Sequence, residues 1–148
     1  MDSAFRWPLR VYYEDTDAGG IVFYANYLKF FERARTEWLR AAGIGQQMLA
    51  VQEQRIFVVK STAIDYHAPA KLDDPLEITV SIRKLGRASV DFMQQAWYCG
   101  ADGAAESRLL CSGGIRVGCV DALSLRPAPI PAAVHERITR FAGNGVPD

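Results

Sequence analysis

The sequence predicts an α+β domain in which one long helix lies against an antiparallel sheet. Apolar residues recur at spacings of three and four between Ile21 and Ala42, which is the pattern of one helical face. Later segments alternate apolar and polar residues, as half-buried strands do, and tight turns separate them. The 148 residues suffice for one core but not for two, so we expect a single domain over residues 1–148, with a C-terminal tail from about residue 127.

The first elements are a strand and the long helix. Residues Phe5 to Tyr13 are rich in aromatic and branched side chains and predict a strand, which the acidic, Gly-containing segment Glu14 to Gly20 closes. Gly43 is a plausible C-cap for the helix that follows. The apolar stripe of that helix is formed by Tyr24, Tyr27, Leu28, Phe31, Ala34, Trp38, Leu39 and Ala42. A stripe of such large side chains predicts burial against a broad surface, which only a sheet provides.

Four further strands are expected after the helix. They cover Ile56–Tyr66, Leu76–Leu85, Ala88–Cys99 and Glu106–Val120. The tight connections at Gly86-Arg87 and Gly100 to Gly103 make successive strands antiparallel, so we expect a meander. Short helices are predicted at Gln46–Gln52 and Pro131–Phe141. Because one helix on one sheet leaves an edge exposed, the sequence also predicts oligomerisation, most simply by edge pairing.

Composition excludes several classes of partner. Lys plus Arg and Asp plus Glu both number 17, and no run of like charges exists, so nucleic acid is not expected to bind. The N-terminus carries Asp2, Arg6 and Pro8 where a signal peptide needs apolar residues, and no stretch is apolar enough to insert into a membrane. The three cysteines show no CxxC spacing, which is typical of reduced thiols. We therefore expect a soluble cytoplasmic protein.

The acidic loop before the long helix is the first candidate site. Unpaired N–H groups and the macrodipole at a helix N-terminus stabilise developing negative charge. Gly19 and Gly20 let a ligand approach the main chain, and Asp17 places a carboxylate beside them. The alternative is an N-cap or Asx-turn role for Asp17. A metal site is not expected, because Asp15 and Asp17 lack further ligands at regular spacing.

The loop and the helix resemble a known family. Residues 10–27 read RVYYEDTDAGGIVFYANY, which is similar to the signature of the 4-hydroxybenzoyl-CoA thioesterase family. Residues 30–40, FFERARTEWLR, with FRWP at residues 5–8, resemble its branch of Tol-Pal-associated acyl-CoA thioesterases. A weaker likeness, including YHAPA at residues 66–70 and LDD at 72–74, extends to about Pro127.

The resemblance implies a hotdog fold, in which a five- to six-stranded antiparallel sheet wraps around the long central helix. It implies no metal and no cofactor, and a homodimer or homotetramer with active sites at the dimer interface. Asp17 matches the family's catalytic carboxylate, and the backbone N–H at Tyr24 matches the group that polarises the thioester carbonyl. The Tol-Pal branch commonly has His where this chain has Tyr24, so the resemblance leaves the acyl preference open.

The function predicted is hydrolysis of a short-chain, medium-chain or aromatic acyl-CoA. Asp17 either attacks the thioester or deprotonates the attacking water, and main-chain amides between Gly20 and Tyr24 hold the oxyanion. One alternative substrate is an acyl-carrier-protein thioester. Another alternative is a non-enzymatic acyl-carrier-binding or envelope-associated protein of the same fold. A hotdog dehydratase is disfavoured, because no His flanks the acidic loop.

Other polar residues are weaker candidates for substrate binding. Coenzyme A carries phosphates that cations bind. The cations proposed to meet them are Arg83, Lys84, Arg87 and Lys60. Asn26 either lines the site or makes a structural hydrogen bond, and His67 either borders the acyl pocket or is structural. The charged helix residues Glu32, Arg33, Arg35 and Glu37 are expected on its solvated side.

Overall fold

The structure of the protein is a computed structural model that describes residues 5–100 and 107–143. The chain forms two compact units, each assembled from three segments of the sequence. Unit 1 comprises Met1–Arg35, Ile64–Val80 and Gln94–Gly113, and unit 2 comprises Thr36–Ala63, Ser81–Met93 and Gly114–Asp148. Most of the predicted turn at residues 100–103 lies outside the described residues.

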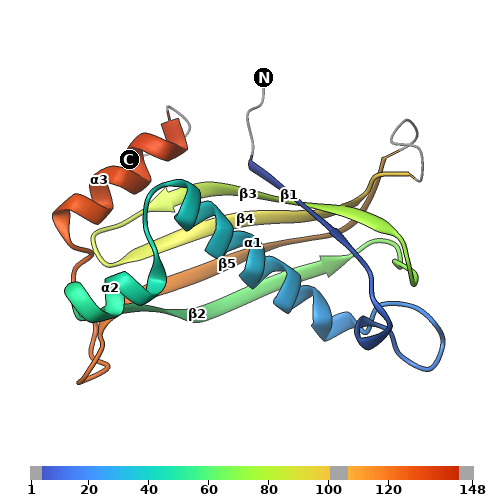
Figure 1. The fold of residues 1–148 in the computed structure, drawn as a ribbon, viewed down its shortest axis with the longest axis horizontal. Helices are drawn as coiled ribbons and strands as arrows, with labels where there is room; N and C mark the ends of the chain where they lie inside the picture. The colour runs from blue at the N-terminus through green and yellow to red at the C-terminus, as the bar shows by residue number, and fades with distance from the viewer. Residues whose placement is uncertain (1–4, 101–106, 144–148) are drawn as a thin grey trace. The chain divides into compact units, whose positions relative to one another are not determined.

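Five strands form one antiparallel sheet, as the sequence predicts. They are β1 (Phe5–Arg10), β2 (Arg55–Tyr66), β3 (Pro75–Leu85), β4 (Ser89–Tyr98) and β5 (Arg108–Asp121). Their order across the sheet is β1-β3-β4-β5-β2, which can be followed in Figure 1. The first pair is antiparallel, with Phe5 opposite Val80 and Arg10 opposite Pro75.

The strand order confirms only part of the predicted meander. The three strands β3, β4 and β5 are neighbours in the sheet in the order of the sequence. In contrast, β2 pairs with β5 instead of β3, since β1 already occupies the free side of β3. As a result, β1 and β2 are the two edges of the sheet. The strand β1 also ends earlier than predicted, because Tyr13–Asp15 form a 3-10 turn.

The long helix begins six residues later than the apolar pattern suggests. The helix α1 spans Tyr27–Ala41, and a 3-10 turn at Tyr24–Asn26 precedes it. Ile21 and Val22 are extended instead of helical, and they form isolated bridges with Lys71 and Thr16. Both residues are β-branched, so extended backbone suits them better than a helix does. The predicted start at Ile21 is therefore wrong.

The buried face of α1 is rotated slightly from the predicted stripe. In unit 1, Tyr27, Phe31 and Ala34 are buried as expected, and Phe30 joins them. Leu28 is 42% exposed and Tyr24 63% exposed, so these two members of the predicted stripe lie outside the core. The later start of the helix explains the exposure of Tyr24, because residues before Tyr27 do not follow the helical period, whereas Leu28 lies within α1 and on its exposed side.

Arg35 was expected on the solvated side of α1, and that expectation is wrong. Its side chain is only 8% exposed. The guanidinium Nη1 donates to Oε1 of Gln94 over 3.0 Å, and Nε2 of Gln94 donates to the carbonyl of Phe31, also over 3.0 Å. Gln94 lies on the buried face of β4 and has no access to water, so its amide needs partners from the helix. Burial lowers the pKa of Arg35.

Unit 2 holds the end of α1 and the two short helices that the sequence predicts. The rings of Phe92 and Phe141 pack edge-on against Trp38, at centroid distances of 6.0 and 5.0 Å. The helices α2 (Gln46–Gln52) and α3 (Ala132–Ala142) confirm the prediction to within one residue. Gly43 has a φ of 87°, which fits its predicted place after the long helix.

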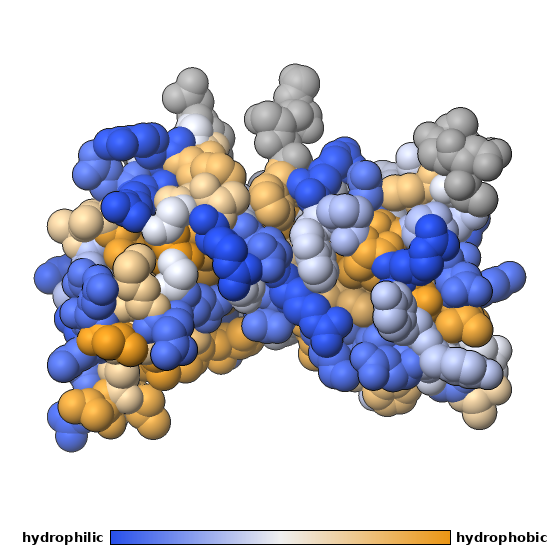
Figure 2. Space-filling model, viewed as in Figure 1, coloured by the Kyte–Doolittle hydropathy of each residue, from blue (hydrophilic) through white to orange (hydrophobic). Residues whose placement is uncertain are grey.

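Several apolar side chains of unit 2 stay exposed. Figure 2 shows hydrophobic residues at the surface where α2 and the loop after β5 lie in Figure 1. The exposed large apolar residues of these two segments are Met48, Val51, Leu123 and Leu125. The loop is joined to the end of α2 by a hydrogen bond from the N–H of Ala122 to the carbonyl of Gln54.

Candidate active site

The acidic loop folds back on itself as a small antiparallel ladder in unit 1. The N–H of Asp17 donates to the carbonyl of Ile21 over 2.9 Å, and the N–H of Phe23 donates to the carbonyl of Asp15 over 3.1 Å. Thr16 and Val22 face each other between these two hydrogen bonds. The turn at the tip is closed by the N–H of Gly20, whose positive φ of 81° favours glycine.

Asp17 lies at this exposed tip. Its Oδ1 accepts a hydrogen bond from the N–H of Gly19 over 2.8 Å, which is the geometry of an Asx-turn. The carboxylate is otherwise open to solvent. Its partner is therefore an amide of its own loop and not an amide of the long helix. The remaining lone pairs of the carboxylate are accessible to an incoming water or thioester.

Some backbone N–H groups of the loop have a hydrogen-bond acceptor and others do not. The Gly20 N–H donates to the carbonyl of Asp17, and the Val22 N–H donates to the carbonyl of Ala70. For the N–H groups of Tyr24 and Ala25 no acceptor is found within residues 5–100 and 107–143. These two amides open the 3-10 turn that leads into α1, so they are unpaired in the manner of any helix start. The N–H groups of Ala18 and Ile21 likewise have no acceptor among the described residues, so the amides open to a substrate oxygen include those near the tip of the loop as well as those at the start of this turn.

Tyr24 is held by an aromatic neighbour that the sequence reasoning did not single out. The hydroxyl of Tyr66 donates to the carbonyl of Tyr24 over 3.1 Å. The two rings also pack edge to face with centroids 6.0 Å apart, and Phe23 lies 4.9 Å from Tyr24 on a tilted plane. Partial burial raises the pKa of Tyr66, so its hydroxyl keeps the proton that it donates. Tyr66 is the last residue of β2, and although it begins the YHAPA stretch of the family likeness, no local pattern gives it a role in the site.

Asp15 is the second residue that sequence reasoning passed over. It is 5% exposed, whereas Asp17 is exposed. One carboxylate oxygen, Oδ1, accepts from Nδ2 of Asn26 over 2.9 Å, and Oδ2 accepts from the N–H of Tyr12 over 2.9 Å. Asn26 is buried and makes a structural hydrogen bond, which is one of the two roles predicted for it.

His67 and Tyr27 are two further titratable side chains of unit 1 that bear on the site. Nε2 of His67 is 2.9 Å from the hydroxyl of Ser112, so the imidazole has a hydrogen-bond partner on β5. The phenol of Tyr27 is buried, and burial raises its pKa to about 12. A phenol with that pKa stays protonated at neutral pH, so Tyr27 is not a general base.

The cations proposed for coenzyme A phosphates all belong to unit 2, but they do not form one cluster. Arg83 donates from Nη1 to Sδ of Met93 over 3.3 Å. The charges of Arg83 and Lys84 also act on Asp91, whose carboxylate holds Arg116 through two hydrogen bonds of 2.9 and 3.2 Å. The aliphatic part of the Lys60 side chain lies across Gly118.

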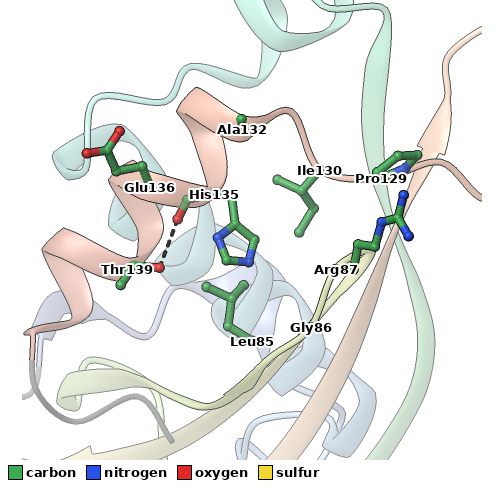
Figure 3. Close-up of a pocket in the computed structure, with 9 residues that line it drawn as sticks. All are labelled: Leu85, Gly86, Arg87, Pro129, Ile130, Ala132, His135, Glu136 and Thr139. Atoms are coloured by element: carbon green, nitrogen blue, oxygen red, sulfur yellow. Dashed lines mark hydrogen bonds between the residues drawn. The ribbon is translucent and has the colours of Figure 1, made fainter. Parts of the chain in front are cut away.

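Arg87 lines a groove of about 630 Å³ between the β3-β4 turn and α3, and the other three cations are not among the lining residues. Figure 3 shows the ring of His135 pointing into the groove between Leu85 and Ile130, while Glu136 points away from it. The walls are mostly apolar, and Arg87 supplies a positive charge at the rim.

No metal site or membrane span emerges from the described residues. Within residues 5–100 and 107–143 no three His, Cys, Asp or Glu side chains gather closely enough to hold a metal ion. No helix in that part of the chain is long and apolar enough to cross a membrane. Cys99, Cys111 and Cys119 are free thiols, and burial raises the pKa of Cys111 to about 12.

Known proteins share both the sequence and the fold. The chain is 45% identical over 130 residues to the acyl-CoA thioester hydrolase YbgC of Escherichia coli O6:H1, an alignment that covers 88% of this chain and 92% of the relative. It is 42% identical over 134 residues to the acyl-CoA thioesterase YbgC of Haemophilus influenzae, covering 90% and 93%.

Solved structures of thioesterases have a similar fold to this chain. The fold of 4-hydroxybenzoyl-CoA thioesterase, seen in a complex of an Asp-to-Asn variant with 4-hydroxybenzoyl-CoA, superposes with a TM-score of 0.83 at 20% identity, over 92% of this chain and 99% of that one. This likeness confirms the predicted hotdog fold. The profile of the thioesterase superfamily matches residues 19–98, a range that includes Tyr24, Asn26 and the whole of α1. The chain belongs to the thioesterase superfamily.

Proposed function

We propose that the protein is an acyl-CoA thioester hydrolase whose catalytic carboxylate is Asp17. The observation that carries the assignment is an exposed carboxylate at the tip of the loop ladder, together with unpaired amides at Tyr24 and Ala25 where the returning arm of the loop enters the 3-10 turn. The two relatives named above, which cover about nine tenths of this chain, both carry an acyl-CoA thioesterase name.

In the proposed reaction the thioester carbonyl oxygen lies against the N–H of Tyr24. The Asp17 carboxylate either attacks the carbonyl carbon or removes a proton from a water that attacks it. Negative charge then collects on the carbonyl oxygen, where preorganised N–H donors stabilise it. Collapse of the tetrahedral species breaks the C–S bond and releases the thiolate of coenzyme A, which takes a proton from Asp17 in the general-base route and from solvent in the nucleophilic route. If Asp17 is the nucleophile, water then hydrolyses the mixed anhydride that remains.

Substitution of Asp17 by Asn tests this assignment. The variant keeps the shape and the Asx-turn acceptor but cannot act as nucleophile or base, so kcat on a good acyl-CoA is expected to fall by about 10²-fold or more. Glu14 is a matched control, because it is an exposed carboxylate of the same acidic segment. Near wild-type turnover in Asp17→Asn, or an equal loss in Glu14→Gln, would remove Asp17 from the mechanism.

The carrier of the acyl group is part of the proposal. We favour coenzyme A, whose phosphates would meet cations of unit 2, over acyl carrier protein. Turnover of the same acyl group on both carriers compares them directly. A panel of short, medium and aromatic acyl-CoA esters defines the acyl preference. Absence of hydrolysis across the panel, with binding retained, would instead support the non-enzymatic acyl-carrier or envelope-associated alternative.

The assembly proposed is a homodimer or homotetramer. Residues 59–63 of the edge strand β2 are exposed on successive positions, which is unusual for a strand and leaves Val59 half exposed. Pairing of this edge with a second copy would cover it. Val59→Lys is expected to shift the protein towards monomer in size-exclusion chromatography with light scattering.

The cellular location proposed is the cytoplasm. The three free thiols support it, because reduced cysteines are typical of that compartment.

A further inference from the structure

Asp15 connects three parts of unit 1 that are separate in sequence. Its carboxylate accepts the N–H of Tyr12, just after β1, and the side-chain amide of Asn26, just before α1. Its carbonyl accepts the N–H of Phe23 across the loop ladder. These groups come from the end of a strand, the returning arm of the loop and the start of the helix. One buried residue therefore fixes the positions of all three.

These contacts enclose the peptide groups at Tyr24. Phe23 is held on one side through its N–H, and Asn26 is held on the other through its side chain. The N–H of Asn26 also donates to the carbonyl of Phe23 over 2.8 Å, which closes the 3-10 turn. The segment from Phe23 to Asn26 consequently has little freedom to turn its unpaired amides away from the loop. The same residue, Asp15, lies two positions before Asp17 on the opposite arm of the ladder.

In the observed arrangement both carboxylate oxygens of residue 15 accept a hydrogen bond. Their partners, the Tyr12 N–H and the Asn26 amide nitrogen, are both donors. An asparagine at 15 loses the negative charge and directs an NH₂ group at one of these donors, so it keeps both contacts only if the Asn26 amide turns over to present Oδ1. The negative charge also lies next to the start of a helical segment, where the backbone dipoles favour it.

We propose that Asp15 is the positioning residue of the active site, which sets the Tyr24 amide and the Asp17 carboxylate at the separation that thioester cleavage requires. The inference rests on the proposed function, because it assumes that these two groups act together. Asp15 itself does not touch the substrate. Its effect is on the geometry of the transition state more than on the affinity for coenzyme A.

The first test substitutes Asp15 by Asn and measures kcat and KM separately. Displacement of catalytic groups by about 1 Å costs up to about 10²-fold in rate, so kcat is expected to fall by about 10-fold or more. KM for the acyl-CoA is expected to stay within about threefold, since kcat carries effects confined to the transition state. Asn26→Ala, which removes one contact and keeps the Tyr12 bond, is expected to lower kcat less.

The second test reverses the donor and the acceptor. In Asp15→Asn/Asn26→Asp the new asparagine donates to the new aspartate through the same pair of positions and still accepts the Tyr12 N–H. We expect the double variant to recover kcat to within about threefold of wild type, whereas Asp15→Asn alone does not. Asp121→Asn is the control, because Asp121 also accepts two hydrogen bonds, from the N–H groups of Leu123 and Ser124 in a loop of unit 2, and forms an ion pair with Arg55 that the substitution removes. It is expected to lower the melting temperature and leave kcat unchanged.

The outcomes separate this inference from the proposed function. If Asp15→Asn keeps kcat within twofold of wild type while Asp17→Asn is inactive, the positioning role is overturned and the catalytic assignment stands. The same holds if the double variant restores the melting temperature but not kcat, because residue 15 then acts on stability alone. If Asp17→Asn is active, the catalytic assignment itself has failed.

Discussion

Lys60 lies across Gly118 so closely that a Cβ at residue 118 would stand 2.6 Å from the Cδ atom of the lysine. Both residues belong to unit 2, on the neighbouring strands β2 and β5. The glycine leaves a space that the aliphatic part of the lysine fills, and within the part of the chain that the structure describes no ion pair holds the ammonium group. Position 118 thus controls where one of the proposed phosphate-binding cations points.

The contact predicts coupling between the two positions. Gly118→Ala is expected to push the Lys60 side chain away and lower the free energy of unfolding, by about 1–3 kcal/mol for overpacking of this kind. In a Lys60→Ala background the obstruction is absent, so the same substitution is expected to cost much less. Chemical denaturation of the four proteins of this double-mutant cycle gives the coupling energy. A coupling energy of zero would contradict the contact.

Arg35 and Gln94 make a second testable pair, in the core of unit 1. Arg35→Met keeps the apolar length of the side chain but leaves Oε1 of Gln94 without its donor, at a cost of about 1–3 kcal/mol in the free energy of unfolding. Arg33→Met is the matched control, because Arg33 is exposed on the same helix. Thermal denaturation should show a clear fall for Arg35→Met and little change for Arg33→Met. Equal melting temperatures would mean that the buried arginine adds nothing to stability.

The Asp91–Arg116 pair predicts a dependence of stability on pH. The hydrogen bonds from Arg116 hold the pKa of Asp91 below its ordinary value. A carboxyl group whose pKa is lower in the folded state stabilises the fold above the pKa of the unfolded chain, and this contribution is lost as pH falls through the folded value. The difference in melting temperature between wild type and Asp91→Asn should therefore be largest near neutral pH and shrink in acid. A difference that is constant from pH 7 to pH 3 would contradict this assignment.

The sequence alone predicts most strands of the fold, but it does not predict where the long helix begins. Local alternation was enough to place β3 and β4 to within one residue at each end, because each strand carries its own period. The start of α1 was placed too early, because the extended state of Ile21 and Val22 depends on pairing with Ala70 and Lys71, which no local pattern reveals.

In the site, resemblance singled out Asp17 and Tyr24, whereas Asp15 and Tyr66 were missed for physical reasons. Asp15 and Asp17 are chemically identical neighbours, and only the fold buries one and exposes the other. Tyr66 reaches Tyr24 from 42 residues along the chain. Arg35 was misplaced because a charged residue on a helix is usually solvated, and its partner Gln94 lies on a distant strand.

Removal of the cations of unit 2 tests their proposed contact with coenzyme A. Combined substitution of Arg83, Lys84 and Arg87 by Ala is expected to raise KM for an acyl-CoA by about 10-fold, which corresponds to about 1.4 kcal/mol of lost binding. The same variant should leave KM for the matching acyl-pantetheine ester unchanged, because that substrate lacks the nucleotide phosphates. Arg140→Ala removes an exposed charge from α3 and serves as the control. An equal rise for both substrates would reject the phosphate contact.

Tyr66 offers a last test, because its hydroxyl binds the carbonyl of Tyr24, the residue whose N–H the proposed reaction uses. The hydrogen bond to the Tyr24 carbonyl fixes the peptide that carries the Ala25 N–H, so its loss should let the first turn before α1 rotate. Tyr66→Phe keeps the edge-to-face packing and deletes only this bond, and kcat is expected to fall about three- to tenfold, in line with about 0.5–1.5 kcal/mol for one neutral hydrogen bond. Tyr13→Phe, at a phenol of the same unit that is mostly exposed, is the control. A kcat unchanged in Tyr66→Phe would mean that ring packing alone holds Tyr24 in place.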